Sequence, residues 1–68
     1  MEKVLITGTS CGVGRAAAIK FLDEGYEVVG LDIKQPSIVH DNYMHFVCDV
    51  SDASSLPEVN NISYLVNN

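Results

Sequence analysis

Apolar runs of two different periods follow one another at the start of the chain. Residues 3–7, KVLIT, are apolar and β-branched and end at Gly8, which is typical of a strand. Residues 12–25, GVGRAAAIKFLDEG, follow the 3.6-residue period of a helix, and Gly25 is a suitable residue to end it. The face that this helix would turn toward a core is small and apolar and consists of Gly14, Ala17, Ala18, Phe21 and Leu22.

Further apolar runs predict strands at residues 27–32 (EVVGLD), 44–49 (MHFVCD) and 62–67 (ISYLVN). These runs are nearly continuous rather than alternating, which favours a parallel sheet with both faces covered. A strand, a helix and a second strand in succession form a βαβ unit, whose crossover is right-handed. The pattern therefore predicts a single α/β domain without repeats or linkers.

The connections after the second and third predicted strands are short. Residues 33–42 contain Pro36 and lack a helical period, so we expect a loop there. Residues 50–61 have room for a short helix that starts near Ser51 or Asp52. Such connections leave less cover on the sheet than full helices would give.

The chain has 68 residues and a formal charge of −5. Nucleic acids and anionic membranes bind clustered Lys and Arg, so neither is expected as a partner. Cys11 and Cys48 make no disulfide framework, and neither they nor His40 and His45 have the spacing of a metal site. The longest apolar run is far too short to span a membrane, and the N-terminus has no signal-peptide layout. We therefore expect a cytoplasmic protein without a bound metal.

The junction between the first strand and the helix carries three glycines. Gly8 permits a sharp turn, and Gly12 lets the main chain approach a ligand with no side chain in the way. Gly14 lies on the helix face that meets the sheet, where the missing Cβ allows close packing. The helix start offers unpaired N–H groups and a partial positive charge to a phosphate, and Thr9 and Ser10 add hydroxyl donors. A plain tight turn is the alternative, but the βαβ context favours a nucleotide phosphate site.

Asp32 ends the second predicted strand. A carboxylate at this position accepts hydrogen bonds from the adenosine ribose hydroxyls and repels a 2′-phosphate. Neither Cys11 nor Ile33 supplies a basic residue for such a phosphate, although Lys34 lies close by. The residues thus favour NAD over NADP as the cofactor. A solvated aspartate at a strand end is the alternative.

Several motifs in order give the chain a family resemblance. TGTSCGVG at residues 7–14 is similar to a TGxxxGxG cofactor motif, CDVSD at 48–52 to an Asp-Val pair after the third strand, and LVNN at 65–68 to the start of an Asn-Asn-Ala-Gly segment. Over essentially its whole length the chain resembles the short-chain dehydrogenases/reductases. The resemblance implies a Rossmann-type parallel sheet of strand order 3-2-1-4, truncated, with residues 1–68 as the incomplete N-terminal part of an NAD-binding domain. The cofactor-binding residues that it implies are Gly8, Thr9, Ser10, Cys11, Gly12, Val13, Gly14, Asp32, Ile33, Asp49, Val50, Asn67 and Asn68.

The resemblance also implies roles for the later motifs. Asp49 would meet the adenine amino group and Val50 the adenine ring, while Asn67 and Asn68 would fix the central sheet and border the cofactor. The family's catalytic serine and Tyr-x-x-x-Lys pair come later than these motifs. None of the three tyrosines in this sequence is followed by a lysine four residues on. We therefore predict no catalytic residue in the chain and no catalysis by these 68 residues alone.

The leading hypothesis is the NAD-binding portion of a longer oxidoreductase that acts on a small alcohol or carbonyl substrate. A dinucleotide-binding module without catalysis, such as a redox sensor or a pseudoenzyme, is the alternative, and an interaction protein that kept only the fold is a third. If the piece stands alone, we expect it to self-associate through an uncovered sheet face or a strand edge.

Overall fold

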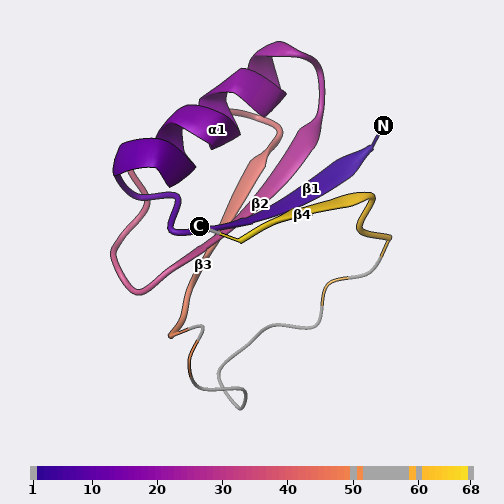
Figure 1. Ribbon diagram of the computed structural model, residues 1–68. Coiled ribbons are helices and arrows are strands. Elements are labelled where there is room, and N and C mark those ends of the chain that lie inside the picture. Colours follow the sequence, from indigo (N-terminus) through magenta and orange to yellow (C-terminus); the bar gives the residue numbers. More distant parts are fainter. Residues whose placement is uncertain (1, 50, 52–58, 60, 68) are drawn as a thin grey trace.

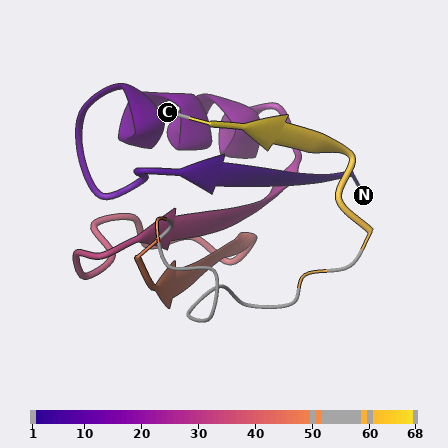
Figure 2. The same ribbon diagram turned by 60° about the horizontal axis from the view of Figure 1, so that its bottom comes forward.

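A parallel sheet with one helix forms the fold. The structure is a computed structural model, and it describes residues 2–49, 51, 59 and 61–67. The elements follow in the order β1 (Lys3–Thr7), α1 (Gly12–Asp23), β2 (Glu27–Asp32), β3 (Tyr43–Val47) and β4 (Tyr64–Val66). All neighbouring strands pair in parallel in the order β3-β2-β1-β4 (Figures 1 and 2). The predicted fold class and strand order are confirmed.

The bounds of β1 and β2 agree with the prediction, whereas those of the outer strands do not. β3 covers Tyr43–Val47 instead of residues 44–49, and β4 covers Tyr64–Val66 instead of residues 62–67. Main-chain pairing continues one residue past the end of β3, where the amide of Cys48 donates to the carbonyl of Asp32 at 3.0 Å. The predicted loop at residues 33–42 holds no helix or strand, while most of the short helix predicted within residues 50–61 lies outside the described residues.

One face of the sheet packs on α1 (Figure 1). The β-branched residues Val4, Ile6 and Val28 alternate with residues of the other face and are fully buried beneath the helix. The helix contributes Ala18 and Leu22 to this core, as its period predicts. Gly25 follows the helix at φ +91°, so the predicted glycine end is also confirmed. The other members of the packed cluster are Ala17, Ile19, Phe21, Tyr26, Ile38, Tyr43 and Val66.

The opposite face of the sheet carries a second, smaller cluster built around Val29, Leu31 and Cys48. Among the described elements no helix lies over this face, and Met44 and Leu65 there are 54% and 65% exposed. The register places Leu5 between Leu65 on one side and Val29 on the other, so apolar side chains continue across the strands. The apolar pattern of the strands predicts a sheet that is covered on both faces. Among the described elements, α1 covers one of the two faces.

Candidate functional site

The first strand and the helix are joined by a turn that depends on glycine. Gly8 has φ +70°, and its amide donates to the carbonyl of Leu31 at 2.7 Å, which ties the turn to β2. Gly12 has φ +63°, and a Cβ added to it would meet no atom within 4 Å. Gly14 is buried in the first turn of α1. The backbone angle therefore requires glycine at positions 8 and 12, and the space in front of Gly12 is open.

The N-terminus of α1 lies at this turn. Cys11 occupies the N-cap position of the helix in an extended conformation, but its side chain makes no capping hydrogen bond. The first turn of the helix carries no acidic residue. Cys11 and Val13 are exposed, the latter at 74%. The first amides of a helix lack intrahelical acceptors and carry a partial positive charge. Since no described side chain caps them here, an anion is a suitable partner for these groups.

The hydroxyls of Thr9 and Ser10 have partners within the chain. Thr9 is fully buried and its hydroxyl lies 2.7 Å from that of Tyr43. Ser10 donates its hydroxyl to the carbonyl of Gln35 at 2.9 Å. The sequence predicts both groups as donors to a ligand, and in the structure each lies at hydrogen-bond distance from another group of the protein.

A second set of bonds joins the glycine-rich turn to the connection after β2. Ser37 donates its hydroxyl to the carbonyl of Ser10 at 2.8 Å, and Arg15 donates from Nε to the Ser37 hydroxyl at 3.1 Å. The sequence gives no signal for Ser37 or Arg15, because their contact depends on how the two connections meet in space. Together these bonds brace the turn from the side of β2.

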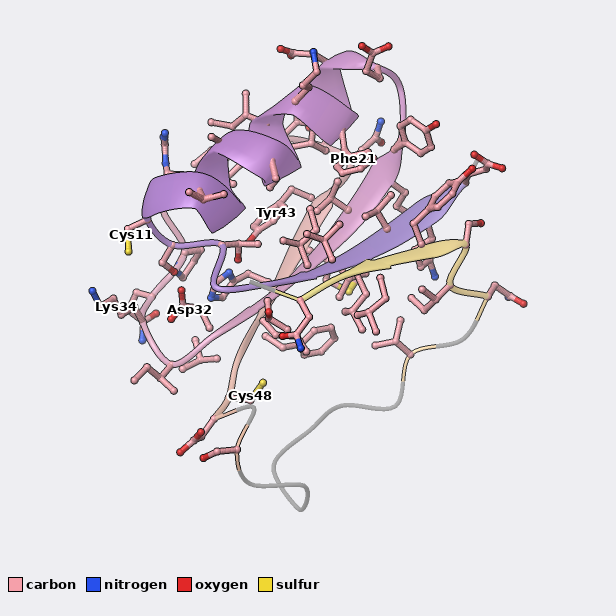
Figure 3. The ribbon with its side chains drawn as sticks, in the orientation of Figure 1. Cys11, Phe21, Asp32, Lys34, Tyr43 and Cys48 are labelled. Carbon is pink, nitrogen blue, oxygen red and sulfur yellow. The ribbon has the colours of Figure 1, made fainter. Side chains whose placement is uncertain are left out.

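Asp32 lies beside the glycine-rich turn at the end of β2, near Lys34 and Cys11 (Figure 3). One carboxylate oxygen accepts from the amide of Lys34 and the other from the amide of Ser10, each at 3.0 Å. These main-chain hydrogen bonds, that of Lys34 first, lower the pKa of the Asp32 carboxyl. The group is thus an anion fixed against the turn, with lone pairs left for further donors.

A pocket of about 250 Å³ opens where the first three strands end. Burial raises the pKa of the Cys48 thiol in its wall, which keeps this residue neutral and apolar. Asp49 holds Ser51 by hydrogen bonds of 2.9 Å to its amide and 2.7 Å to its hydroxyl, and these bonds lower the pKa of Asp49. The pocket is lined by Thr7, Gly8, Leu31, Asp32, Ile33, Cys48 and Asp49.

The structure thus brings most of the predicted site residues to the carboxyl edge of the sheet. Gly8, Asp32, Ile33 and Asp49 line one pocket, and the loop residues adjoin it through the bond between Ser10 and Asp32. Asn67 joins the end of β4 to β1, because the Thr7 hydroxyl donates to its Oδ1 at 3.2 Å. The predicted residues Val50 and Asn68 lie outside the described residues.

The described part of the chain contains neither a candidate metal site nor a helix that could span a membrane. Among those residues no group of three or more His, Cys, Asp or Glu side chains is placed to hold a metal ion. No described helix is long and apolar enough to cross a bilayer. A hollow at the other end of α1, lined by Ala17, Phe21 and Tyr26 among others, holds none of the predicted site residues.

Comparisons with known proteins agree with this geometry. The chain is 46% identical over 54 residues to the short chain dehydrogenase ausX of Emericella nidulans, across 75% of this chain and 27% of that protein. The ligand-free aldohexose dehydrogenase of Thermoplasma acidophilum is similar in structure, with a TM-score of 0.84 and 39% identity, over 98% of this chain and 29% of that one. A short chain dehydrogenase from Leptospira borgpetersenii with bound NAD+ gives a TM-score of 0.74 and 27% identity, over 79% of this chain and 22% of that one. No family model matches the chain. The chain spans about a quarter of the length of the curated relatives that it matches.

Proposed function

We propose that this chain, which belongs to the short-chain dehydrogenase/reductase family by its sequence and its fold, is the part of an oxidoreductase that binds NAD(H). Its 68 residues then form the N-terminal part of the NAD-binding domain. The whole enzyme moves hydride between this cofactor and a small alcohol or carbonyl substrate in the cytoplasm. In such an enzyme the nicotinamide carries the hydride, and this chain positions the diphosphate and the adenosine of the cofactor.

One observation carries the proposal: an uncapped helix N-terminus, reached through a turn at positive φ, lies next to an ionised strand-end carboxylate. The diphosphate of a dinucleotide fits the first feature, since it accepts main-chain N–H donors and interacts favourably with the helix dipole. The adenosine ribose fits the second, since its hydroxyls donate to a carboxylate. Parallel α/β sheets bind such ligands at the carboxyl ends of their strands.

The proposal gives each site residue a role, which for Val50 and Asn68 comes from the sequence motifs alone. Gly8 makes the turn, and the main chain of residues 9–14, from Thr9 through Ser10, Cys11, Gly12 and Val13 to Gly14, surrounds the diphosphate, with the Ser10 amide donating to Asp32 and the later amides to the diphosphate. Asp32 accepts from the ribose, and Ile33 lies beside the adenine. Asp49 and Val50 meet the adenine amino group and ring, while Asn67 and Asn68 border the cofactor.

The same carboxylate supports NAD over NADP. The 2′-phosphate of NADP would bring a second anion against Asp32, which the main-chain donors of Lys34 and Ser10 keep ionised. The similar protein from Leptospira borgpetersenii contains bound NAD+. Lys34 and Arg15 are the nearby cations that would favour the phosphorylated cofactor instead.

Titration of the full-length protein with NAD+ and with NADP+ in a calorimeter tests this proposal. We expect NAD+ to bind more tightly, and Asp32→Asn to shift the ratio of the two dissociation constants toward NADP+ by about tenfold, which corresponds to ~1.4 kcal/mol. The matched control is Asp41→Asn, which removes an exposed carboxylate outside the site. Binding of neither dinucleotide would refute the function, while binding without turnover of any alcohol or carbonyl compound would favour a cofactor-binding module.

The sheet face without a helix supports a proposal about association. Met44 and Leu65 expose apolar side chains on that face of the sheet, and β3 and β4 are its two edge strands. Apolar patches and unpaired strand edges favour contacts with other chains. We expect the isolated chain to self-associate through this face or these edges.

A further inference from the structure

A line of hydrogen bonds runs beneath the glycine-rich turn and has no place in the function proposed above. The hydroxyl of Thr9 lies 2.7 Å from that of Tyr43, which lies 2.7 Å from Nδ1 of His45. Nε2 of His45 lies 3.0 Å from the main-chain carbonyl of Lys34. The line therefore joins the turn after β1 to the connection after β2, through two side chains of β3.

Gly30 provides the space for this line. It pairs in register with His45 on the neighbouring strand and with Ile6 on β1, in the middle of the sheet. A Cβ at this position would collide with the hydroxyls of Tyr43 and Thr9. Because Gly30 lacks a side chain, both hydroxyls reach into the layer between the sheet and α1.

The last bond of the line fixes the direction of all the others. The Lys34 carbonyl only accepts, so Nε2 of His45 must carry the hydrogen. In a neutral imidazole Nδ1 is then an acceptor, and the Tyr43 hydroxyl must donate to it. The Tyr43 oxygen is left to accept, so Thr9 donates its hydroxyl to Tyr43. Every polar atom in the line is thereby satisfied while His45 is neutral.

We propose that Tyr43 and His45 are positioning residues for the cofactor-binding turn, and that the charge on His45 sets how tightly the turn binds NAD(H). The inference rests on the proposed function, because it assigns a regulator to that same site. It concerns two side chains of β3 that reach the turn through the Thr9 hydroxyl.

Protonation of His45 reverses the line. Nδ1 then becomes a donor, the Tyr43 oxygen must accept from it, and the Tyr43 hydrogen turns toward Thr9. Tyr43 is the hydrogen-bond partner that the described residues offer the Thr9 hydroxyl, and Thr9 is 0% exposed, so water does not replace it. The contact between Thr9 and Tyr43 is kept with Tyr43 as the donor, but the buried Thr9 hydrogen loses its acceptor. This cost falls on the turn immediately before Ser10, whose amide holds Asp32. The diphosphate and ribose sites both adjoin this turn, so we expect the two to weaken together.

The charged and titratable groups around His45 come from each neighbouring element. Tyr43 lies on its own strand, and its pKa is raised by burial and, to a smaller degree, by the charge of Asp32 at the end of β2. Lys34 follows Asp32, and Arg15 reaches from α1 to Ser37 in the same connection. A positive His45 would by itself attract an anionic cofactor, which is opposite in sign to the effect of the reversed line. The two effects are therefore separable by experiment.

The test measures the dissociation constant of NAD+ by calorimetry with the full-length protein between about pH 5.5 and 8, the interval in which imidazoles change charge. We expect affinity to fall roughly fivefold or more toward the acid end, the effect of one buried donor left without an acceptor. Tyr43→Phe cuts the line while leaving His45 in place, so its pH response should become flat or reverse. Thr9→Val should do the same, and Thr9→Ser should restore the wild-type response. His40→Gln, which changes the exposed histidine, should leave that response unchanged.

A Tyr43→Phe protein that keeps the wild-type response would overturn the inference, because His45 would then act without Tyr43. If the wild-type protein binds neither NAD+ nor NADP+ at any pH, the proposed function fails, and the inference with it. A measurement without variants is the nitrogen-15 NMR spectrum of His45. A hydrogen on Nε2 in the neutral ring supports the assigned direction, and a hydrogen on Nδ1 refutes it.

Discussion

Two glycines at opposite ends of α1 allow cofactor binding to be separated from backbone strain. Gly12 has φ +63° and Gly25 has φ +91°, and an added Cβ would meet no atom within 4 Å at either position. Alanine at either site therefore has the same problem, a left-handed backbone, and no steric collision. Only Gly12 lies in the proposed diphosphate site.

The cost in stability follows from the backbone angle. Alanine in the left-handed region costs about 1–2 kcal/mol per residue, and its smaller unfolded-state entropy returns about 0.4–1 kcal/mol. We expect Gly12→Ala and Gly25→Ala each to be destabilised by about 1 kcal/mol, which lowers Tm by roughly 4–8 °C in a domain of 60–100 residues. Thermal melts followed by circular dichroism measure this loss.

The cost in binding should differ between the two variants. The Gly12→Ala methyl group stands between the main chain and the diphosphate, so we expect NAD+ to bind at least tenfold more weakly, a loss of ~1.4 kcal/mol or more. Gly25→Ala should bind as the wild type does. Calorimetric titration with NAD+ checks both. Equal dissociation constants for the two variants would refute the idea that the open space before Gly12 receives the cofactor.

Three further changes test the fold and its charges. Gly30→Ala should destabilise the protein by about 1–3 kcal/mol, as overpacking does, because the new methyl group collides with the Tyr43 and Thr9 hydroxyls; an unchanged midpoint of urea unfolding would contradict this. The pKa of Asp32 is lowered on folding, so its stabilisation is fully present above the unfolded value of about 3.9 and is lost as the pH falls through the folded pKa. Asp32→Asn should thus be less stable than the wild type at pH 7, with a gap that closes below about pH 4, and a gap independent of pH in acid unfolding would argue against it. Leu65→Lys should reduce self-association of the isolated chain in sedimentation velocity, whereas Val39→Lys, at a fully exposed loop position, should not; equal effects of the two would show that the sheet face is not the contact.

The sequence predicts the inner part of the fold well, since its pattern there is set by local physics. β1 and β2 are apolar runs bounded by glycine or charge, and the helix face follows a clear period. The outer strands end at their last residue paired in register, and their own composition does not show this. The apolar run at residues 44–49 continues past Val47, but the register pairs Val47 with Asp32, the last residue of β2.

The candidate site also has a part that the sequence predicts and a part that it does not. The glycine turn, the helix start and Asp32 follow from residue types at a strand–helix junction, and the structure brings them together. The partners of the Thr9 and Ser10 hydroxyls within the protein could not be predicted, because they lie 34 and 25 residues away along the chain. Tyr43 lies just before the strand that the sequence predicts at residues 44–49, and only the register that places His45 opposite Gly30 shows where its hydroxyl goes.

The most direct test of the account is the position of the diphosphate in a structure of the full-length protein with NAD+ bound. We predict that its oxygens accept hydrogen bonds from main-chain amides within residues 9–14, with the adenosine ribose against Asp32. A diphosphate bound elsewhere, with those amides facing only solvent, would contradict it.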